Sequence, residues 1–172
     1  MNVRLVTFAA VAVTFLQPLT ILAAEPLALE TTIPLSNTSG RIDHLSVDVV
    51  RKRLFIAEIG NGSVDIVDLN ARKVIQRIAG LDEPQGVVYA PKADLIAVAC
   101  GGDGTVRIFT ASDFSPRGVV RLGDDADNMR LDSRNGHVIV GYGDGALAII
   151  DTANAETASN TTAALRAVPG GQ

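Results

Sequence analysis

Polar side chains that could bind a ligand occur in three short segments of the sequence. Carboxylate oxygens suit a bound cation, and His44 could act as a base or as a nitrogen ligand. Alternatively, Asp and Asn in such segments satisfy backbone groups in tight turns, and His44 hydrogen-bonds its neighbours; this second role is the commoner one. The candidate residues are Arg41, Asp43, His44, Glu83, Gln85, Asp125, Asp127, Asn128 and Arg130.

The three segments are evenly spaced along the chain. Asp43, Gln85 and Asp127 lie 42 residues apart, and a set of apolar residues keeps the same interval. That set is Leu54, Ile96 and Val138. A fixed interval of this length indicates an internal structural repeat, so the polar segments occupy equivalent places in it.

Each repeat contains a glycine-rich turn between two apolar runs, at residues 60–68, 101–109 and 141–151. Gly-Asn-Gly or Asp-Gly followed by an alternating β-branched run is typical of a β-hairpin. We expect four strands in each of the first two repeats and three in the last. The expected strands are 44–48, 53–59, 63–69, 73–78, 85–90, 94–100, 105–110, 117–122, 128–132, 137–142 and 146–151.

Four short antiparallel strands in about 42 residues are typical of one blade of a β-propeller. The sequence therefore predicts an all-β partial propeller over residues 25–153, with about three four-stranded blades. Almost continuous apolar runs indicate that the second strands are buried on both faces, whereas the alternating third strands are expected nearer the solvent. Because propellers typically use about 4 to 8 blades, we expect an incomplete ring. The expected blades are 40–81, 82–122 and 123–153.

The two ends of the chain are expected to differ from the repeats. Residues 1–24 combine Arg4, an apolar run and small residues, as in a cleaved secretory signal; an uncleaved membrane anchor is the alternative. Residues 27–35 predict one further strand, of the kind that completes the last blade of a closed ring. Residues 154–172 lack apolar alternation, which predicts an irregular or disordered tail. We therefore expect a longer propeller that is truncated after Asp151.

Composition narrows the possible functions. With 15 basic and 19 acidic residues the formal charge is −4, which argues against a general affinity for nucleic acid. The single cysteine, Cys100, ends an apolar run and is expected to be a buried small hydrophobe. Residues 141–145 match part of a dinucleotide-binding motif but lead into a strand, so no cofactor is expected.

Several motifs resemble those of a known family, the bacterial exported YncE-like propellers with YVTN-type repeats. The similarity covers about residues 27–153. It implies a seven-bladed ring and a periplasmic or secreted location, but it is weak for any activity. The motifs are 40–48, 83–87, 101–106, 123–128 and 141–145.

The candidate residues fall in the loops that join the last strand of one blade to the first strand of the next. In a propeller these loops surround the mouth of the central channel. We expect a module that binds a small-molecule or protein ligand there and does no chemistry itself. The alternatives are a lactonase-like or metal-dependent hydrolase that uses His44, Asp125 and Asp127, or a non-functional truncated fragment. We also expect no membrane association after signal cleavage, and possible self-association through exposed blade edges.

Overall fold

The computed structural model describes residues 27–153 and, for the backbone alone, residues 159–162. The predicted signal at 1–24 lies outside the described residues. The chain divides into two units, 1–32 and 33–172, and all the strands belong to the second. Of the first unit, residues 27–32 are described, and they have no regular secondary structure. Within the described ranges, no helix is long and apolar enough to cross a membrane.

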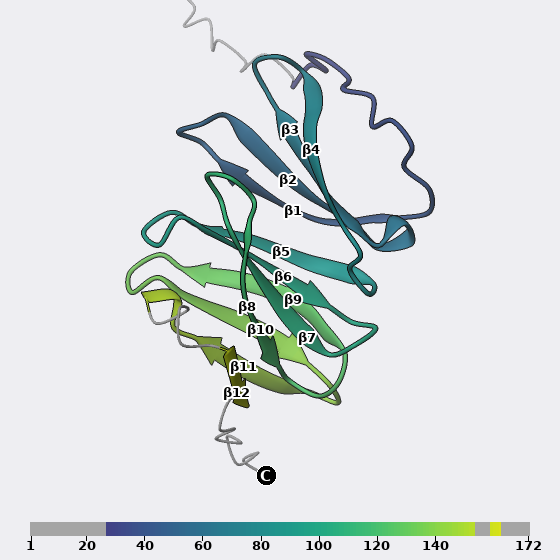
Figure 1. The fold of residues 1–172 in the computed structure, drawn as a ribbon. Coiled ribbons are helices and arrows are strands. Elements are labelled where there is room, and N and C mark those ends of the chain that lie inside the picture. The colour runs from purple at the N-terminus through teal and green to yellow at the C-terminus, as the bar shows by residue number, and fades with distance from the viewer. Residues whose placement is uncertain (1–26, 154–158, 163–172) are drawn as a thin grey trace, which may run out of the picture. The chain divides into compact units, whose positions relative to one another are not determined.

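The second unit consists of three antiparallel sheets, which we call blades 1, 2 and 3 (Figure 1). Each blade is a meander in which consecutive strands pair. A short 3-10 helix, η1 (Ile59–Asn61), joins β2 to β3. Blade 1 contains β1 (Ile42–Asp48), β2 (Arg53–Glu58), β3 (Ser63–Asp68) and β4 (Lys73–Ala79). Blade 2 contains β5 (Pro84–Ala90), β6 (Leu95–Cys100), β7 (Thr105–Thr110) and β8 (Pro116–Arg121). Blade 3 contains β9 (Ala126–Asp132), β10 (His137–Tyr142) and β11 (Ala146–Ile150).

The strands predicted within the three repeats are therefore confirmed, with ends that shift by at most two residues. The hairpin turns end on a glycine with positive φ at equivalent places, 60° at Gly62 and 60° at Gly104. An added Cβ there would also clash with the backbone of Leu81 or Asp124. Only glycine combines that conformation with that close approach, which explains why the turn motif recurs.

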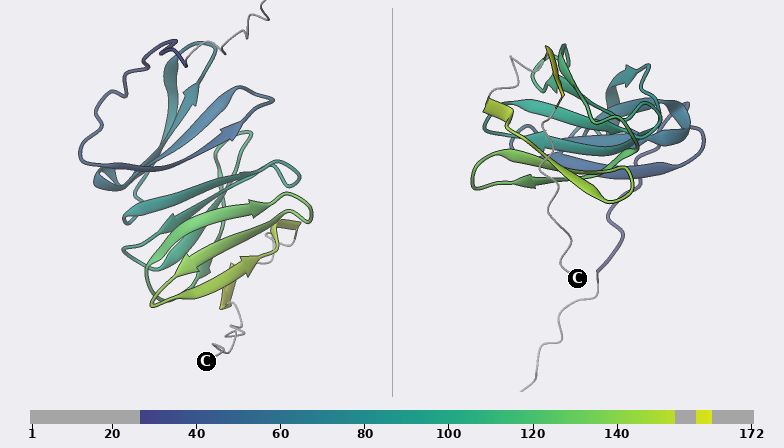
Figure 2. Two further views of the ribbon diagram at one scale, coloured as in Figure 1. Left: turned by 180° about the vertical axis from the view of Figure 1, so that it is seen from behind. Right: turned by 90° about the horizontal axis from the view of Figure 1, so that it is seen from below.

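The blades are stacked in chain order, and their first strands β1, β5 and β9 lie side by side (Figures 1 and 2). We call the face of a blade that looks toward the next blade its forward face and the other its backward face. The forward face of blade 1 packs on the backward face of blade 2, and blade 2 packs on blade 3 in the same way. The forward residues of blade 1 are Phe55, Ala57, Val64, Ile66 and Ile78. Those of blade 2, each 42 positions later, are Ala97, Ala99, Val106, Ile108 and Val120.

The all-β class and the incomplete propeller are thus confirmed, but the third strand of blade 1 differs from expectation. All of β3 from Ser63 to Val67 is buried, including Asp65 with 0% exposure. The alternation in β3 distinguishes two buried faces, one apolar and one partly charged. The prediction that this strand lies nearer the solvent was therefore wrong for β3.

The structure also differs from the predictions for the chain ends, at residues 27–35 and at residues 159–162. Residues 27–35 do not form a strand. Strand propensity is not sufficient without a hydrogen-bonded neighbour, and Pro34 also lacks a backbone donor. In the expected irregular tail, β12 (Ser159–Thr162) forms a short strand that pairs in parallel with β8 and extends blade 2 to five strands. The open edge of β8 supplies the backbone partners. Residues 154–158 and 163–172 lie outside the described part.

Candidate functional site

The first strands of the three blades line a groove of about 470 Å³. Its walls are the middle of β1, β5 and β9, and the candidate residues of the sequence lie at the ends where these strands begin. His44 and Arg130 contribute to both the groove and the candidate set. The apolar part of the lining is Leu45, Val47, Val87, Val88, Met129 and Leu131.

Three candidate residues converge near this end of the groove. One potential ligand atom from each of Asp43, His44 and Asp127 lies within 4.8 Å of the other two, and all three side chains are half-buried. Asp43 and His44 come from blade 1, whereas Asp127 comes from blade 3. The fold therefore brings together residues that are more than 80 positions apart in the sequence. We call this group the carboxylate–histidine cluster.

Hydrogen bonds hold the two cluster residues that come from blade 1. His44 Nδ1 lies 3.1 Å from the backbone oxygen of Gln85 and 3.3 Å from Asp43 Oδ1. Arg41 donates to Asp43 Oδ2 at 3.2 Å. When neutral with its hydrogen on Nδ1, His44 donates to Gln85 and keeps a lone pair on Nε2 for a ligand.

The remaining candidates form two hydrogen-bonded pairs, and Glu83 is separate from both. Gln85 Nε2 donates to Asp125 Oδ1 at 3.2 Å, which joins β5 to the loop before β9. Arg130 donates to Asn128 Oδ1, two positions away on the same strand, β9. Glu83 instead has a turn role: it is exposed, its φ is 47°, and its backbone oxygen accepts a hydrogen bond from Gly101.

Gly86 determines how closely blade 3 approaches blade 2 at the cluster. It is the repeat equivalent of His44 and Asn128, both 42 positions away. A Cβ at Gly86 would clash with the backbone oxygen of Asp127 and lie 2.7 Å from Met129 Cγ. The absence of a side chain therefore lets Asp127 come within reach of His44.

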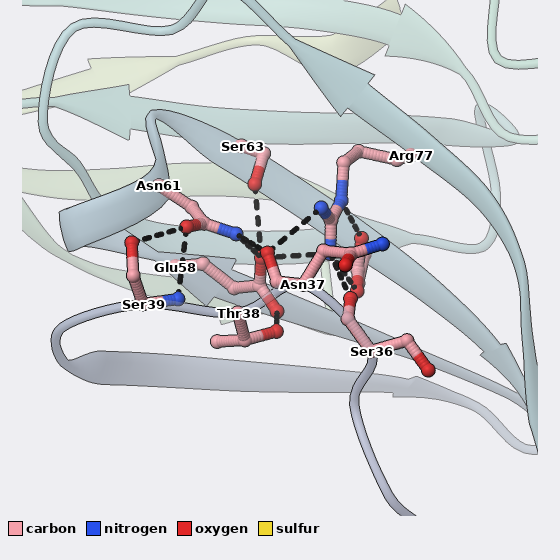
Figure 3. Close-up of polar contacts among 9 residues, drawn as sticks. Ser36, Asn37, Thr38, Ser39, Glu58, Asn61, Ser63 and Arg77 are labelled. Carbon is pink, nitrogen blue, oxygen red and sulfur yellow. Dashed lines mark hydrogen bonds and ion pairs between the residues drawn. The ribbon is translucent and has the colours of Figure 1, made fainter.

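A second polar group was not predicted, and it lies on the backward face of blade 1 (Figure 3). Glu58 and Asp65 are both 0% exposed, and Arg77 lies between them and the solvent. Arg77 makes a bidentate contact with Asp65, at 2.6 Å from Nε and 2.8 Å from Nη2, and lies 3.4 Å from Glu58. We call these three residues with Thr38, Asn61 and Ser63 the blade 1 polar cluster.

The polar cluster also fixes the segment that precedes β1. Glu58 accepts hydrogen bonds from Thr38 at 2.7 Å, Ser63 at 2.9 Å and Asn61 at 3.0 Å. Asn61 also donates to the backbone oxygen of Asn37, and Arg77 donates to the same oxygen. Residues 36–39 are thereby held against blade 1 by side chains rather than by a strand ladder (Figure 3).

A comparison of repeat positions could have revealed this cluster from the sequence. Glu58 is equivalent to Cys100 and Tyr142, which are buried in the contacts between blades. Burial raises the pKa of the Cys100 thiol to about 11, so this residue is an unreactive part of the core, as expected. A carboxylate at an otherwise apolar position is the informative signal, because buried charges require partners.

Another unpredicted contact ties blade 1 to blade 2. Arg51 lies 3.0 Å from the buried carboxylate of Asp48 and 2.6 Å from the partly exposed carboxylate of Asp94. It also donates a hydrogen bond to Tyr89 Oη at 3.1 Å. Burial alone would raise the pKa of Asp48, but hydrogen bonds from Arg51 and from the Val50 backbone hold it below its usual value. These contacts lie at the opposite end of the first strands from the carboxylate–histidine cluster.

Known structures identify the fold. The chain is 18% identical to hydrazine synthase of Kuenenia stuttgartiensis, with a TM-score of 0.62 over 74% of this chain and 37% of that one. It is 16% identical to the β-propeller domain of Myceliophteria thermophila Cps50 (Swd1), with a TM-score of 0.56 over 66% of this chain and 36% of that one. It is 23% identical to the WD40 β-propeller domain of Doa1, with a TM-score of 0.56 over 66% of this chain and 37% of that one.

These likenesses show the propeller fold alone, and the chain spans little more than a third of the length of each structure. No family model matches the sequence. No curated protein matches it either.

Proposed function

We propose that this chain is part of an exported YncE-like propeller that binds a ligand at the mouth of its channel and does no chemistry itself. The observation that carries this proposal is the convergence of Asp43, His44 and Asp127 from two blades. Two carboxylates and an imidazole can bind a divalent cation or a cationic group of a polar small molecule or protein ligand. The signal-like residues 1–24 support a periplasmic or secreted location.

Titration calorimetry with Zn²⁺ tests this proposal, because one imidazole and two carboxylates suit that ion. We expect one ion per chain, with binding at least about 10-fold weaker in His44→Ala and in Asp127→Asn, because each change removes one ligand. Glu83→Gln is the matched control, since it neutralises a nearby loop carboxylate outside the cluster. Binding that is absent, or that all three variants retain equally, would contradict the proposal. Circular dichroism checks that each variant is folded.

A metal-dependent hydrolase is the second candidate, and the same cluster favours it. A cation held by Asp43, His44 and Asp127 could lower the pKa of a bound water and make it a nucleophile, as a lactonase requires. Metal-dependent hydrolysis of a simple lactone that is lost in Asp127→Asn would support an enzyme. Binding of the ion without hydrolysis would support the binding module.

A further inference from the structure

Asp43 and His44, the two cluster residues from blade 1, lie in a β-bulge. Between Ile42 and Leu45 the first strand advances by three residues while its partner β2 advances by two. In a regular strand neighbouring side chains point to opposite faces, but a bulge changes the direction of a side chain. Here Asp43 Oδ1 and His44 Nδ1 lie only 3.3 Å apart. The bulge therefore lets two successive residues serve one site, and their ligand atoms depend on what holds it in place.

The two flanks of the bulge are held differently. After it, residues 45–48 of β1 pair with β2 in unbroken register. Before it, Ile42 makes a single pair with Glu58, and the described residues 36–41 lie outside the strands. The hydrogen-bond ladder thus fixes one flank, and side chains fix the other.

Asn61 is central to this second support (Figure 3). Its side-chain oxygen accepts hydrogen bonds from the backbone and the hydroxyl of Ser39, at 2.9 Å and 2.8 Å. Its side-chain nitrogen donates to the backbone oxygen of Asn37 at 2.8 Å and to Glu58 at 3.0 Å. Glu58 in turn accepts a hydrogen bond from Thr38 at 2.7 Å. One amide group therefore links the incoming segment to the buried carboxylate.

The incoming segment also crosses η1 with no side chain between the two backbones. A Cβ added to Gly40 would lie 2.9 Å from Gly60 Cα, and a Cβ added to Gly60 would lie 2.7 Å from the backbone oxygen of Ser39. Only glycine permits backbones to approach so closely. Because the chain runs directly from this crossing into the bulge, a shift of the crossing would also move Asp43 and His44.

Blade 2 holds the corresponding entry by backbone groups. The backbone N–H groups of residues 101–102 donate to the backbone oxygens of residues 82–83, directly before β5. The repeat equivalent of Asn61 is Asp103, which pairs with Arg107 of its own blade at 2.6 Å. The hydrogen bonds of Asn61 to an incoming segment therefore distinguish blade 1, the blade that supplies two of the three cluster residues.

We propose that Asn61 is a positioning residue for the carboxylate–histidine cluster. By holding residues 36–40 against blade 1, it fixes the bulge. The bulge in turn presents Asp43 and His44 to Asp127 of blade 3. Asn61 acts through these residues and is not itself a ligand. The inference rests on the proposed function for what the site binds, but not for the geometry of His44.

Two measurements on the full chain test this inference: titration calorimetry with Zn²⁺, and NMR of the imidazole nitrogens of His44 in the ion-free protein. Asn61→Ala removes the hydrogen bonds to Ser39, Asn37 and Glu58 without changing the charge. We expect Zn²⁺ binding to become about 10-fold weaker, at the lower end of the effect of groups that orient metal ligands. The His44 resonances should also shift. Thr38→Val removes a single hydrogen bond and should have smaller effects in the same direction.

Ser63→Ala is the matched control. Ser63 donates to Glu58 at 2.9 Å from β3, and in the described part of the chain it makes no side-chain hydrogen bond to residues 36–40. It should lower stability and leave both Zn²⁺ affinity and the His44 resonances unchanged. An equal loss of affinity in Ser63→Ala and Asn61→Ala would indicate general loosening of blade 1 and would overturn the inference. Circular dichroism establishes that each variant is folded, and Thr38→Val decides if Asn61→Ala does not fold.

The inference and the proposed function fail in different ways. If the unchanged protein binds no Zn²⁺, the proposed function fails, and the His44 resonances of Asn61→Ala and Ser63→Ala decide the inference alone. If the unchanged protein binds Zn²⁺ and Asn61→Ala binds it equally well, the inference fails and the proposed function stands. Unchanged His44 resonances in Asn61→Ala would overturn the inference in either case.

Discussion

The two ends of the stack of blades differ in how their outer faces are covered. The backward face of blade 1 carries Glu58 and Asp65, which are fully buried beneath Arg77 and residues 36–39. The forward face of blade 3 carries Leu147 and Ile149, which are two-thirds exposed. Both faces derive from the same repeat, so the residues at a few equivalent positions determine whether a blade ends in a polar cluster or in an open apolar surface.

The polar end is self-contained, because every charge in it has a partner within the chain. The apolar end exposes large side chains of the kind that a neighbouring blade covers in blades 1 and 2. The difference predicts opposite sensitivities: blade 1 should be damaged by losing a charge, and blade 3 should tolerate losing an aliphatic side chain.

Arg77→Met should have the largest effect on stability. It leaves Glu58 and Asp65 buried without a counter-charge, and breaking a buried pair in this way costs about 3–5 kcal/mol. The free energy of unfolding from urea titration measures the loss. Arg107→Met is the control in blade 2: Arg107 occupies the repeat position of Asp65 and its partner Asp103 is 27% exposed, so the change should cost only about 1 kcal/mol. Equal losses in the two variants would mean that the buried charges of blade 1 have no special role.

Gly86→Ala should have the next largest effect, because it moves blade 3 relative to blade 2. The added methyl group meets the backbone of Asp127, which cannot move alone, and overpacking of this kind costs about 1–3 kcal/mol. The same displacement should weaken Zn²⁺ binding by moving Asp127 away from His44. Gly80→Ala is the control, since no atom lies within 4 Å of its added Cβ and only its positive φ is strained. Unchanged ion binding in a destabilised Gly86→Ala variant would separate the carboxylate–histidine cluster from this contact.

The stability that the Arg51 contacts give to the fold should depend on pH. The folded-state pKa of Asp48 lies below its usual value, so its stabilising contribution is complete above about pH 4 and disappears as the pH falls through the folded pKa. Asp48→Asn should therefore lower stability near neutral pH and flatten the loss below about pH 4. Urea unfolding of both proteins at several pH values measures this. Parallel pH profiles would show that Asp48 does not contribute.

Tyr142→Phe should have the smallest effect and the opposite sign. Tyr142 is the repeat equivalent of Glu58, but its hydroxyl is the one buried side-chain polar atom in the described residues that lacks a hydrogen bond. Removing it should leave stability unchanged or raise it by up to about 1 kcal/mol, because an unsatisfied buried hydroxyl is unfavourable. Thermal unfolding is sufficient to measure this. A clear loss of stability would show that the hydroxyl has a partner, such as a buried water.

Most of the fold could be predicted because two local signals agree throughout the repeat. Glycine-rich turns such as the one at Gly104 fix the hairpins, and the 42-residue interval aligns them into blades. Part of the candidate site followed from the same alignment, since equivalent positions meet at one end of neighbouring blades. The convergence of Asp127 with His44 depends on the close contact between Gly86 and the backbone of Asp127. A single sequence contains no pattern that predicts this contact.

The polar cluster was missed because periodicity alone does not tell a solvated face from a buried charged one. The alternation of Asp65 with Val64 and Ile66 is the same whether Asp65 faces solvent or a buried partner. The strand predicted at 27–35 failed for a related reason, since propensity carries no information about whether a neighbouring strand is available. In both cases the deciding interaction was long-range.

Equivalent isoleucines in the three blades provide the most direct test of the difference between the two ends. Ile66→Ala, Ile108→Ala and Ile149→Ala remove the same atoms from positions with 0%, 3% and 66% exposure. Urea unfolding should give losses of about 2–5 kcal/mol for the first two and below about 1 kcal/mol for the third. A loss for Ile149→Ala as large as that for Ile108→Ala would show that the forward face of blade 3 is covered and would contradict this account.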